Sequence, residues 1–237
     1  MPESKLTFER IQKEITDNRN ILDQIHRAQL AVRGYQTRPS MLFTAELAPA
    51  GHRSFRLLAQ GDSWFDYPPG TDIIDCLHDE YNHTIVNIAV AGSTLNDEAY
   101  GPVPRELFGL PFGPQQSDDP SRIAELLYRI QEDSPQALLL DGGGNDVAGD
   151  EFFSFINNAR SGLPSVNQQV LDGTIIPTLQ TAYEYVIDNV LTAAPTMKIF
   201  IHGYDYPWPD GRGLIDFLGW RVGPSVRPEA GLCVLWG

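Results

Sequence analysis

The chain has 237 residues, of which 31 are acidic and 17 basic, giving a formal net charge of −14. So acidic a chain is not expected to bind nucleic acid or an anionic membrane surface, because phosphate groups are bound by clustered Lys and Arg. No apolar run approaches the roughly 18 residues of a membrane span, and the N-terminal residues are too charged for a signal peptide. The two cysteines, Cys76 and Cys233, cannot build a disulfide framework. We therefore expect a soluble, reduced, cytoplasmic protein.

The first element is a helix predicted over residues 5–33. Its apolar side chains recur at helical spacing along one face, at Ile11, Ile15, Leu22, Ile25 and Val32. Gly34 and Pro39 end the pattern. We expect this helix to pack one stripe onto the rest of the protein. The predicted organisation is an N-terminal helical extension, residues 1–40, followed by one domain, residues 41–237.

Short apolar runs alternate with amphipathic segments after this helix. Strands are predicted at 55–59, 85–90, 137–140 and 199–201, and helices at 72–81, 120–132 and 177–193. The alternation predicts right-handed crossovers and a parallel sheet covered by helices on both faces. Asp119 is the expected N-cap of the middle helix, with Pro120 in its first position. Residues 101–120 are predicted to be a long loop, and 232–236 is a candidate for one more strand.

Each predicted strand is followed by glycine and polar residues. The four endings are Gln60-Gly-Asp-Ser-Trp64, Ala91-Gly-Ser-Thr94, Asp141-Gly-Gly-Gly-Asn-Asp146 and His202-Gly-Tyr-Asp205. In a parallel sheet these endings share the edge at which open α/β folds bind ligands. Turns of this composition occur in any such fold. The meeting of a hydroxyl, an amide side chain and glycine turns at one edge is more specific.

This combination of side chains is typical of acyl transfer. A serine nucleophile needs a general base and hydrogen-bond donors for the oxyanion. Ser63 is the best-placed hydroxyl, directly after the first strand. The Asn145 amide and the backbone N–H groups of Gly92 and Ser63 are the candidate donors.

At these residues the sequence resembles the SGNH or GDSL hydrolases, a family of esterases and lipases. Gly61-Asp-Ser63 matches the family's first block, residues 87–94 match the second, and Gly143-Gly-Asn145-Asp match the third. The resemblance covers about residues 54–210 and leaves the first helix outside. It implies a three-layer α/β/α sandwich with a parallel, flavodoxin-like sheet, and cofactor-free ester hydrolysis through an acyl-serine. It also implies Ser63 as nucleophile, with Gly92 and Asn145 in the oxyanion hole.

The family's last block, Asp-x-x-His, which supplies the general base, has no counterpart after Asn145. Its absence leaves two explanations: the chain ends before that block, or the activity is lost. His202, the one histidine after Asn145, is the only base that the chain itself offers at this edge, and Asp205 or Asp210 could orient it. A histidine at a strand end more often forms hydrogen bonds with neighbouring loops, so His202 is not the favoured base. The Gly- and Pro-rich ending favours a C-terminally truncated domain and hence a poor esterase. The one Asp-x-x-His in the chain, Asp75 to His78, lies in a predicted helix and is not expected to be catalytic.

Metal and nucleotide sites are weaker interpretations. The cluster of Asp72, Asp75, His78, Asp79 and His83 is more simply a solvated helix face than a metal site.

The triple glycine before Asn145 lacks the Gly-Lys-Ser/Thr of a phosphate loop, and Gly143 stands where a calcium loop needs an oxygen ligand. No cofactor is therefore expected. Three aromatic residues, Tyr204, Tyr206 and Trp208, either line a pocket or form a packed loop.

The sequence thus favours a serine hydrolase acting on carboxylic esters of small molecules. The alternative is a catalytically impaired fragment or pseudoenzyme that binds through the same pocket. A third possibility is an interaction module whose active part is the helix over residues 5–33. The candidate substrates are O-acetyl sugars, lipids, thioesters and aryl esters.

Overall fold

The computed structural model describes residues 2–33, 54–67, 72–107, 110–111, 113–147, 154–158 and 160–203. The chain divides into two compact units, Met1–His202 and Gly203–Gly237. All described residues except Gly203 belong to the first unit. The predicted strand at 232–236, the aromatic cluster Tyr204, Tyr206 and Trp208, and Asp205 and Asp210 lie outside the described residues.

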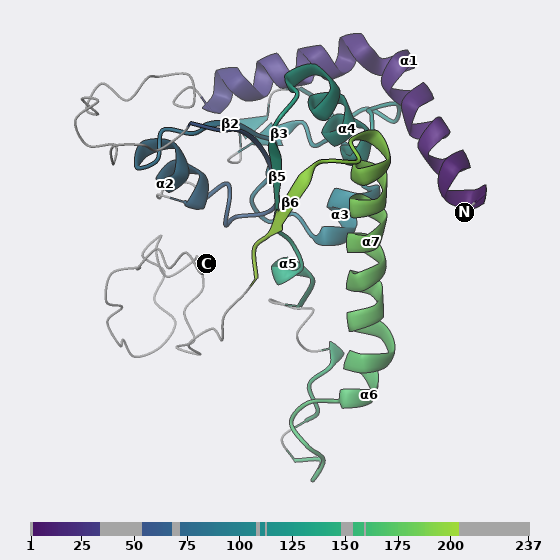
Figure 1. Ribbon diagram of the computed structural model, residues 1–237. Coiled ribbons are helices and arrows are strands. Elements are labelled where there is room, and N and C mark those ends of the chain that lie inside the picture. Colours follow the sequence, from purple (N-terminus) through teal and green to yellow (C-terminus); the bar gives the residue numbers. More distant parts are fainter. Residues whose placement is uncertain are drawn as a thin grey trace. The chain divides into compact units, whose positions relative to one another are not determined.

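A four-stranded parallel sheet forms the centre of the first unit (Figure 1). Its strands are β1 (Arg56–Gln60), β2 (Thr84–Asn87), β5 (Ala137–Leu140) and β6 (Lys198–Ile201), in the order β2-β1-β5-β6. All neighbouring pairs are parallel. Counted along the chain, these four strands have the spatial order 2-1-3-4, which is that of flavodoxin-like sheets. The predicted parallel sheet is confirmed, with strand boundaries shifted by up to three residues.

Helices cover both faces of the sheet, as predicted. On one face, α1 (Pro2–Arg33), α3 (Leu95–Tyr100), α4 (Arg122–Asp133) and α7 (Ile176–Ala193) share a core with Leu58 and Leu138. On the other face, α2 (Ile73–Asp79) contributes Ile74 to a second core with Leu57 and Ala137. Adjacent strand residues therefore point into different cores, which is the alternation of a sheet buried on both sides. The first unit therefore has the three α/β/α layers that the family resemblance implies.

The N-terminal helix α1 packs against α4. Four residues of the predicted stripe, Ile11, Ile15, Leu22 and Ile25, are each at most 4% exposed, and the side chain of the fifth, Val32, lies outside the described part. Polar contacts flank this stripe: Tyr128 donates to Asp23 over 2.6 Å, and the Ser121 backbone N–H donates to Glu14 over 2.6 Å. Residues 34–53 lie outside the described part, so the boundary at residue 40 stays a prediction.

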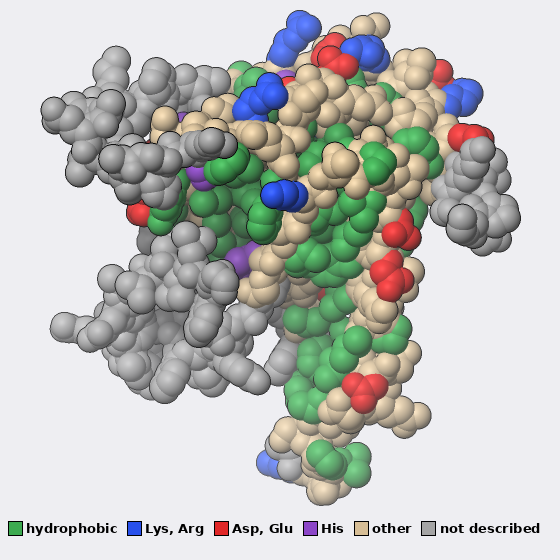
Figure 2. Space-filling view, in the orientation of Figure 1, with side chains coloured by type: hydrophobic (Ala, Val, Ile, Leu, Met, Phe, Trp, Pro, Cys, Tyr) green, Lys and Arg blue, Asp and Glu red, His purple; other side chains and the backbone are tan. Residues whose placement is uncertain are grey.

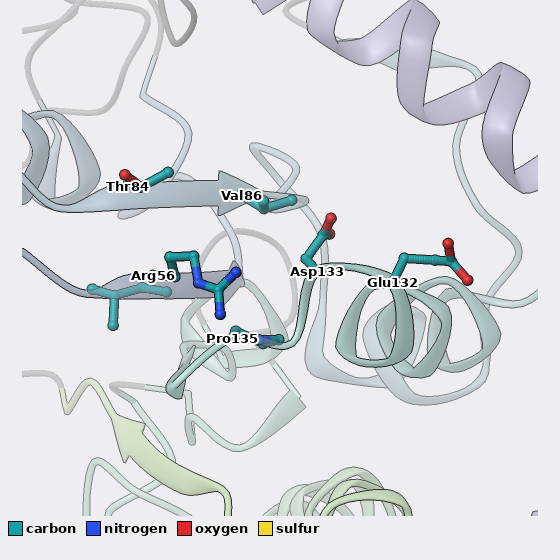
Figure 3. A pocket seen from close by; sticks show the side chains of 7 residues that line it. Arg56, Thr84, Val86, Glu132, Asp133 and Pro135 are labelled. Carbon is teal, nitrogen blue, oxygen red and sulfur yellow. The ribbon is translucent and has the colours of Figure 1, made fainter.

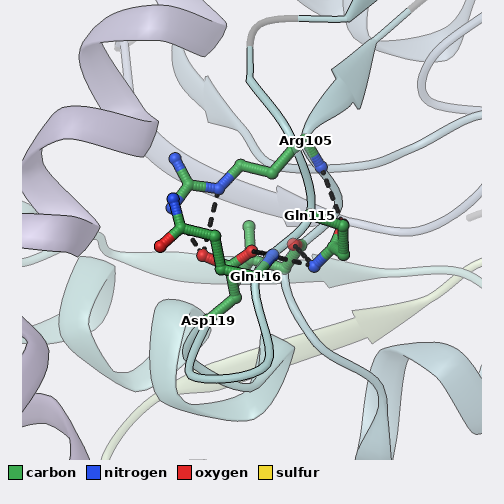
Figure 4. A network of polar contacts seen from close by, with 5 residues as sticks. Arg105, Gln115, Gln116 and Asp119 are labelled. Atoms are coloured by element: carbon green, nitrogen blue, oxygen red, sulfur yellow. Dashed lines mark hydrogen bonds and ion pairs between the residues drawn. The ribbon is translucent and has the colours of Figure 1, made fainter.

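The start of α4 differs from expectation. Ser121 is the N-cap, and its hydroxyl accepts the Ala124 N–H over 3.3 Å. Asp119 instead closes the preceding loop, accepting from Arg105 Nε over 3.1 Å and from the Gln116 N–H over 2.8 Å (Figure 4). The expected cap was wrong because the carboxylate has a guanidinium partner within the loop. That loop also contains two short antiparallel strands, β3 (Glu106–Leu107) and β4 (Leu110–Pro111).

Several short helices were not predicted. Thr94 and Asp97 form a capping box at the start of α3. Asn145 lies in the one-turn α5 (Gly144–Val147). Before α7, α6 (Gln168–Val170) continues into the π-helical turn η2 (Leu171–Ile175).

Apolar side chains gather on the surface over β6 and α7 (Figure 2). The large apolar residues of these two elements that are more than a third exposed are Ile176, Leu191, Phe200 and Ile201. None of the described helices combines the length and the apolar character needed to cross a bilayer.

Candidate active site

The turn after β1 carries Ser63. The Phe65 N–H donates to the Asp62 carbonyl over 3.1 Å, and the Trp64 N–H donates to Asp62 Oδ1 over 3.0 Å. Asp62 is only 1% exposed, whereas Ser63 is half-buried. At Gly61, a Cβ atom would lie 2.8 Å from Cβ of Asp141. Glycine is therefore required at this position so that the turn after β1 can pack against the residue that follows β5.

The loop after β2 carries Gly92 and Ser93. Gly92 has φ +82° and is exposed, a backbone conformation that favours glycine. Within the described residues, no protein acceptor is recorded for its N–H. Ser93 is buried, and its Oγ lies 3.2 Å from the Gly61 carbonyl and 3.1 Å from Glu98 Oε1. The second loop is thus fixed to the first at Gly61.

The Asn145 side chain joins the loops after three strands. Its Nδ2 donates to the Ser93 carbonyl over 2.9 Å and to Asp62 Oδ2 over 3.2 Å. Asp62 and Ser93 are the chain neighbours of Ser63 and Gly92. The structure therefore brings the three predicted site residues to the same edge of the sheet, the one reached by the carboxyl ends of β1, β2 and β5.

His202 lies at this edge too, directly after β6. Its Nδ1 is 3.2 Å from Asp141 Oδ1, and Asp141 is fully buried at the end of β5. The His202 ring centroid lies 5.0 Å from that of Trp64 and 6.2 Å from that of Phe65. The ring is thus held between a carboxylate and two aromatic side chains that follow Ser63 in the chain.

A buried carboxyl group lies beneath the site. Glu98, in α3, is fully buried, and this burial raises its pKa to about 8 against the opposing effects of Arg122 and Ser93. The nearby Asp62 and Asp141 carboxylates contribute to the same rise. Through Ser93, Glu98 connects to the carbonyl group that holds Asn145.

Asp75 and His78 both form their contacts within or at the start of α2. Asp75 forms a capping box with Asp72, accepting the Asp72 N–H over 3.3 Å and donating its own N–H to Asp72 Oδ1 over 2.9 Å. Burial and the Asp72 charge raise the pKa of Asp75 to about 6. His78 Nδ1 lies 2.9 Å from its neighbour Asp79. These contacts account for both residues within the helix.

A pocket at the opposite edge of the sheet contains none of the predicted site residues (Figure 3). It lies near the amino ends of β1 and β2 and is lined by Arg56, Leu57, Thr84, Val86, Glu132, Asp133 and Pro135. Ligands of open parallel sheets bind at the carboxyl ends of the strands, so this pocket is not our candidate.

No family model matches the chain, and no curated protein matches it. Among solved structures, the chain is similar to a family 3 carbohydrate esterase from Clostridium thermocellum, with 15% sequence identity and a TM-score of 0.36. The match covers 67% of this chain and 65% of the other, so the chain spans less than two thirds of that structure. So distant a likeness carries no argument about activity.

The sequence indicated roles for Ser63, Gly92 and Asn145, offered His202 only as a less favoured base, and gave no role to Asp141 or Glu98. Asp141 directly follows β5, so its position in the sequence carried the same signal as that of the other strand-end residues. Glu98 had no such signal, because α3 was not predicted.

Proposed function

We propose that this chain is a serine hydrolase that cleaves carboxylic esters through an acyl-serine intermediate. Ser63 is the nucleophile in this proposal, and the Gly92 N–H and the Asn145 amide stabilise the oxyanion. The observation that carries the proposal is that the Asn145 amide donates hydrogen bonds to both Asp62 and Ser93. Asp62 immediately precedes the nucleophile Ser63, and Ser93 immediately follows Gly92. The resemblance of the three sequence blocks to SGNH hydrolases supports the same roles.

The chemistry follows from these positions. Ser63 Oγ attacks the ester carbonyl carbon, and the carbonyl oxygen becomes an oxyanion. Donors held in place before the reaction stabilise this charge without reorganising, and losing one typically costs about 10²–10³-fold in turnover. Gly92 presents a backbone N–H from an exposed loop. Asn145 is fixed by its neighbours, so a substrate oxyanion competes with the Asp62 carboxylate for one Nδ2 hydrogen.

Covalent labelling tests the nucleophile. A fluorophosphonate probe should label wild-type protein and not Ser63→Ala, with Ser161→Ala as the matched control. Ser161 is exposed, and its Oγ accepts the Leu163 N–H in a loop apart from the strand ends. Labelling sites are read by peptide mass spectrometry.

Hydrolysis is then measured on aryl esters, thioesters, O-acetyl sugars and lipid esters. The proposal expects turnover of at least one class that is lost in Ser63→Ala and kept in Ser161→Ala. Folded wild-type protein that is neither labelled nor active on any class would contradict the proposal and favour the non-catalytic binding domain.

A further inference from the structure

We infer that His202 is the general base for Ser63 and that Asp141 is its positioning residue. This inference rests on the proposed function. From the sequence, Asp205 and Asp210 were the candidates to orient His202. The structure instead has Asp141, which comes before Asn145 in the chain, next to the His202 ring.

The position of Asp141 defines which ring nitrogen acts as the base. As a carboxylate, Asp141 only accepts hydrogen bonds, so Nδ1 of His202, 3.2 Å away, carries the hydrogen. The lone pair of the neutral ring then lies on Nε2. The His202 backbone N–H also donates to the Leu140 carbonyl over 2.9 Å, which fixes the main chain beside Asp141.

The Asp141 carboxylate is buried, and a buried charge is stabilised by a hydrogen-bonding partner such as an imidazole. The residue is fully buried, and its Oδ2 has no hydrogen-bond partner within the described residues. The His202 side chain is 27% exposed, so it borders both the buried carboxylate and solvent. A buried carboxylate favours a neighbouring cation, which is the form that the imidazole takes after accepting a proton.

The His202 ring lies beside the turn that carries the nucleophile. Trp64, the residue after Ser63, lies against the ring with centroids 5.0 Å apart. Gly61 lets this turn approach Asp141, because any larger residue would meet the Asp141 side chain. The loops that follow β1, β5 and β6 therefore meet at His202.

The protons and bonds balance over the two halves of the reaction. As the bond between Ser63 Oγ and the carbonyl carbon forms, the hydroxyl proton passes to Nε2 of His202. The same proton then passes to the leaving alcohol oxygen as the ester C–O bond breaks, which gives the acyl-serine. Water attacks the acyl carbon with His202 again taking a proton, and the acid leaves as Ser63 regains its hydrogen.

The experiment compares wild type, Ser63→Ala, His202→Ala and Asp141→Asn, with His78→Ala as the matched control. His78 is paired with Asp79 on α2 and belongs to the one Asp-x-x-His of the sequence. The assays are the rate of Ser63 labelling by a fluorophosphonate, and kcat and KM for p-nitrophenyl acetate, with and without added imidazole. Thermal unfolding checks that each variant is folded.

We expect His202→Ala to lower kcat and the labelling rate by about 10²–10⁴-fold with little change in KM, and imidazole to restore part of the loss. Asp141→Asn should lower kcat by up to about 10⁴-fold, because an amide also permits the other tautomer. His78→Ala should match wild type. If Asp141→Asn does not fold, His202→Ala and its imidazole rescue still decide the question.

Two results would overturn the inference, and they differ in what they leave standing. Ser63-dependent turnover that survives in His202→Ala places the base elsewhere and leaves the proposed function intact. Folded wild-type protein without Ser63-dependent labelling or turnover removes both.

Discussion

Asn145 and Asp62 are joined by a 3.2 Å hydrogen bond from the amide nitrogen to the carboxylate, and the same nitrogen donates to the Ser93 carbonyl over 2.9 Å. Both amide hydrogens are therefore directed to protein acceptors before any substrate binds. The orientation of Asn145 is fixed in advance by this arrangement. It also means that the oxyanion must compete for one hydrogen, and the longer bond, to Asp62, is the one we expect to yield.

Replacing Asn145 tests this role. If the amide donates to the oxyanion, Asn145→Ala should lower kcat by about 10²–10³-fold. KM should change little, because this bond strengthens only in the transition state. The control is Asn157→Ala, since the Asn157 amide donates to the Pro164 carbonyl in an exposed loop. An unchanged kcat in Asn145→Ala would assign the residue to loop structure alone.

The second prediction follows from the positive φ angle of Gly92. Gly92 has φ +82°, and a Cβ atom added there would meet nothing within 4 Å. Gly92→Ala should therefore destabilise the fold by roughly 1–2 kcal/mol through backbone strain alone. Because the alanine backbone resists this conformation, we also expect the N–H to shift and kcat to fall by at least about tenfold.

Gly173→Ala is the control for Gly92. Gly173 lies in the helical turn η2, also with nothing near its added Cβ, and should be neutral or stabilised by up to about 1 kcal/mol. Chemical denaturation of both variants gives the comparison. Equal stability changes at the two positions would contradict the strain argument.

Glu98 should make stability depend on pH. Burial raises its pKa from 4.5 to about 8 in the folded protein, so near pH 7 the folded state keeps a proton that the unfolded state has lost. Raising the pH then favours unfolding until the folded carboxyl ionises. Between pH 7 and 8 the free energy of unfolding should fall by about 1 kcal/mol. Asp75, with a pKa of about 6, and His26, lowered to about 4 by burial, titrate below this window.

Glu98→Gln is the variant that isolates this effect, because the amide is neutral and of nearly the same size. Denaturation with urea at pH 7 and pH 8 should show the fall in wild type and not in Glu98→Gln. Parallel pH dependence in the two proteins would mean that Glu98 is already ionised at pH 7.

The helix α1 should be part of the folding unit. Leu22 is 1% exposed within the core shared with α4, so Leu22→Ala should cost about 2–5 kcal/mol. Asn20→Ala, on the exposed face of the same helix, should change stability by less than about 0.5 kcal/mol. Equal effects, measured by denaturation, would indicate a helix that contributes little to the core.

The order of the elements and their buried faces followed from the sequence because hydrophobic periodicity is a local property. The spacing of Ile11, Ile15 and Leu22 predicted which face of α1 is buried, and the run at 137–140 coincides with β5. The start of α4 was misassigned because Asp119 finds Arg105, fourteen residues away, as its partner. The charge-assisted hydrogen bond between a carboxylate and a guanidinium is stronger than the hydrogen bond that a helix N-cap forms.

By itself, the sequence determined that Ser63, Gly92, Asn145 and His202 follow strands and therefore share one edge of a parallel sheet. Only the tertiary structure decided which of them meet. Asp141 and His202 are 61 positions apart and lie in contact because β5 and β6 are neighbours in the sheet. Glu98 reaches the site because α3 packs beneath it. Strand order and helix packing depend on the fit of the whole core, which no local pattern of residues encodes.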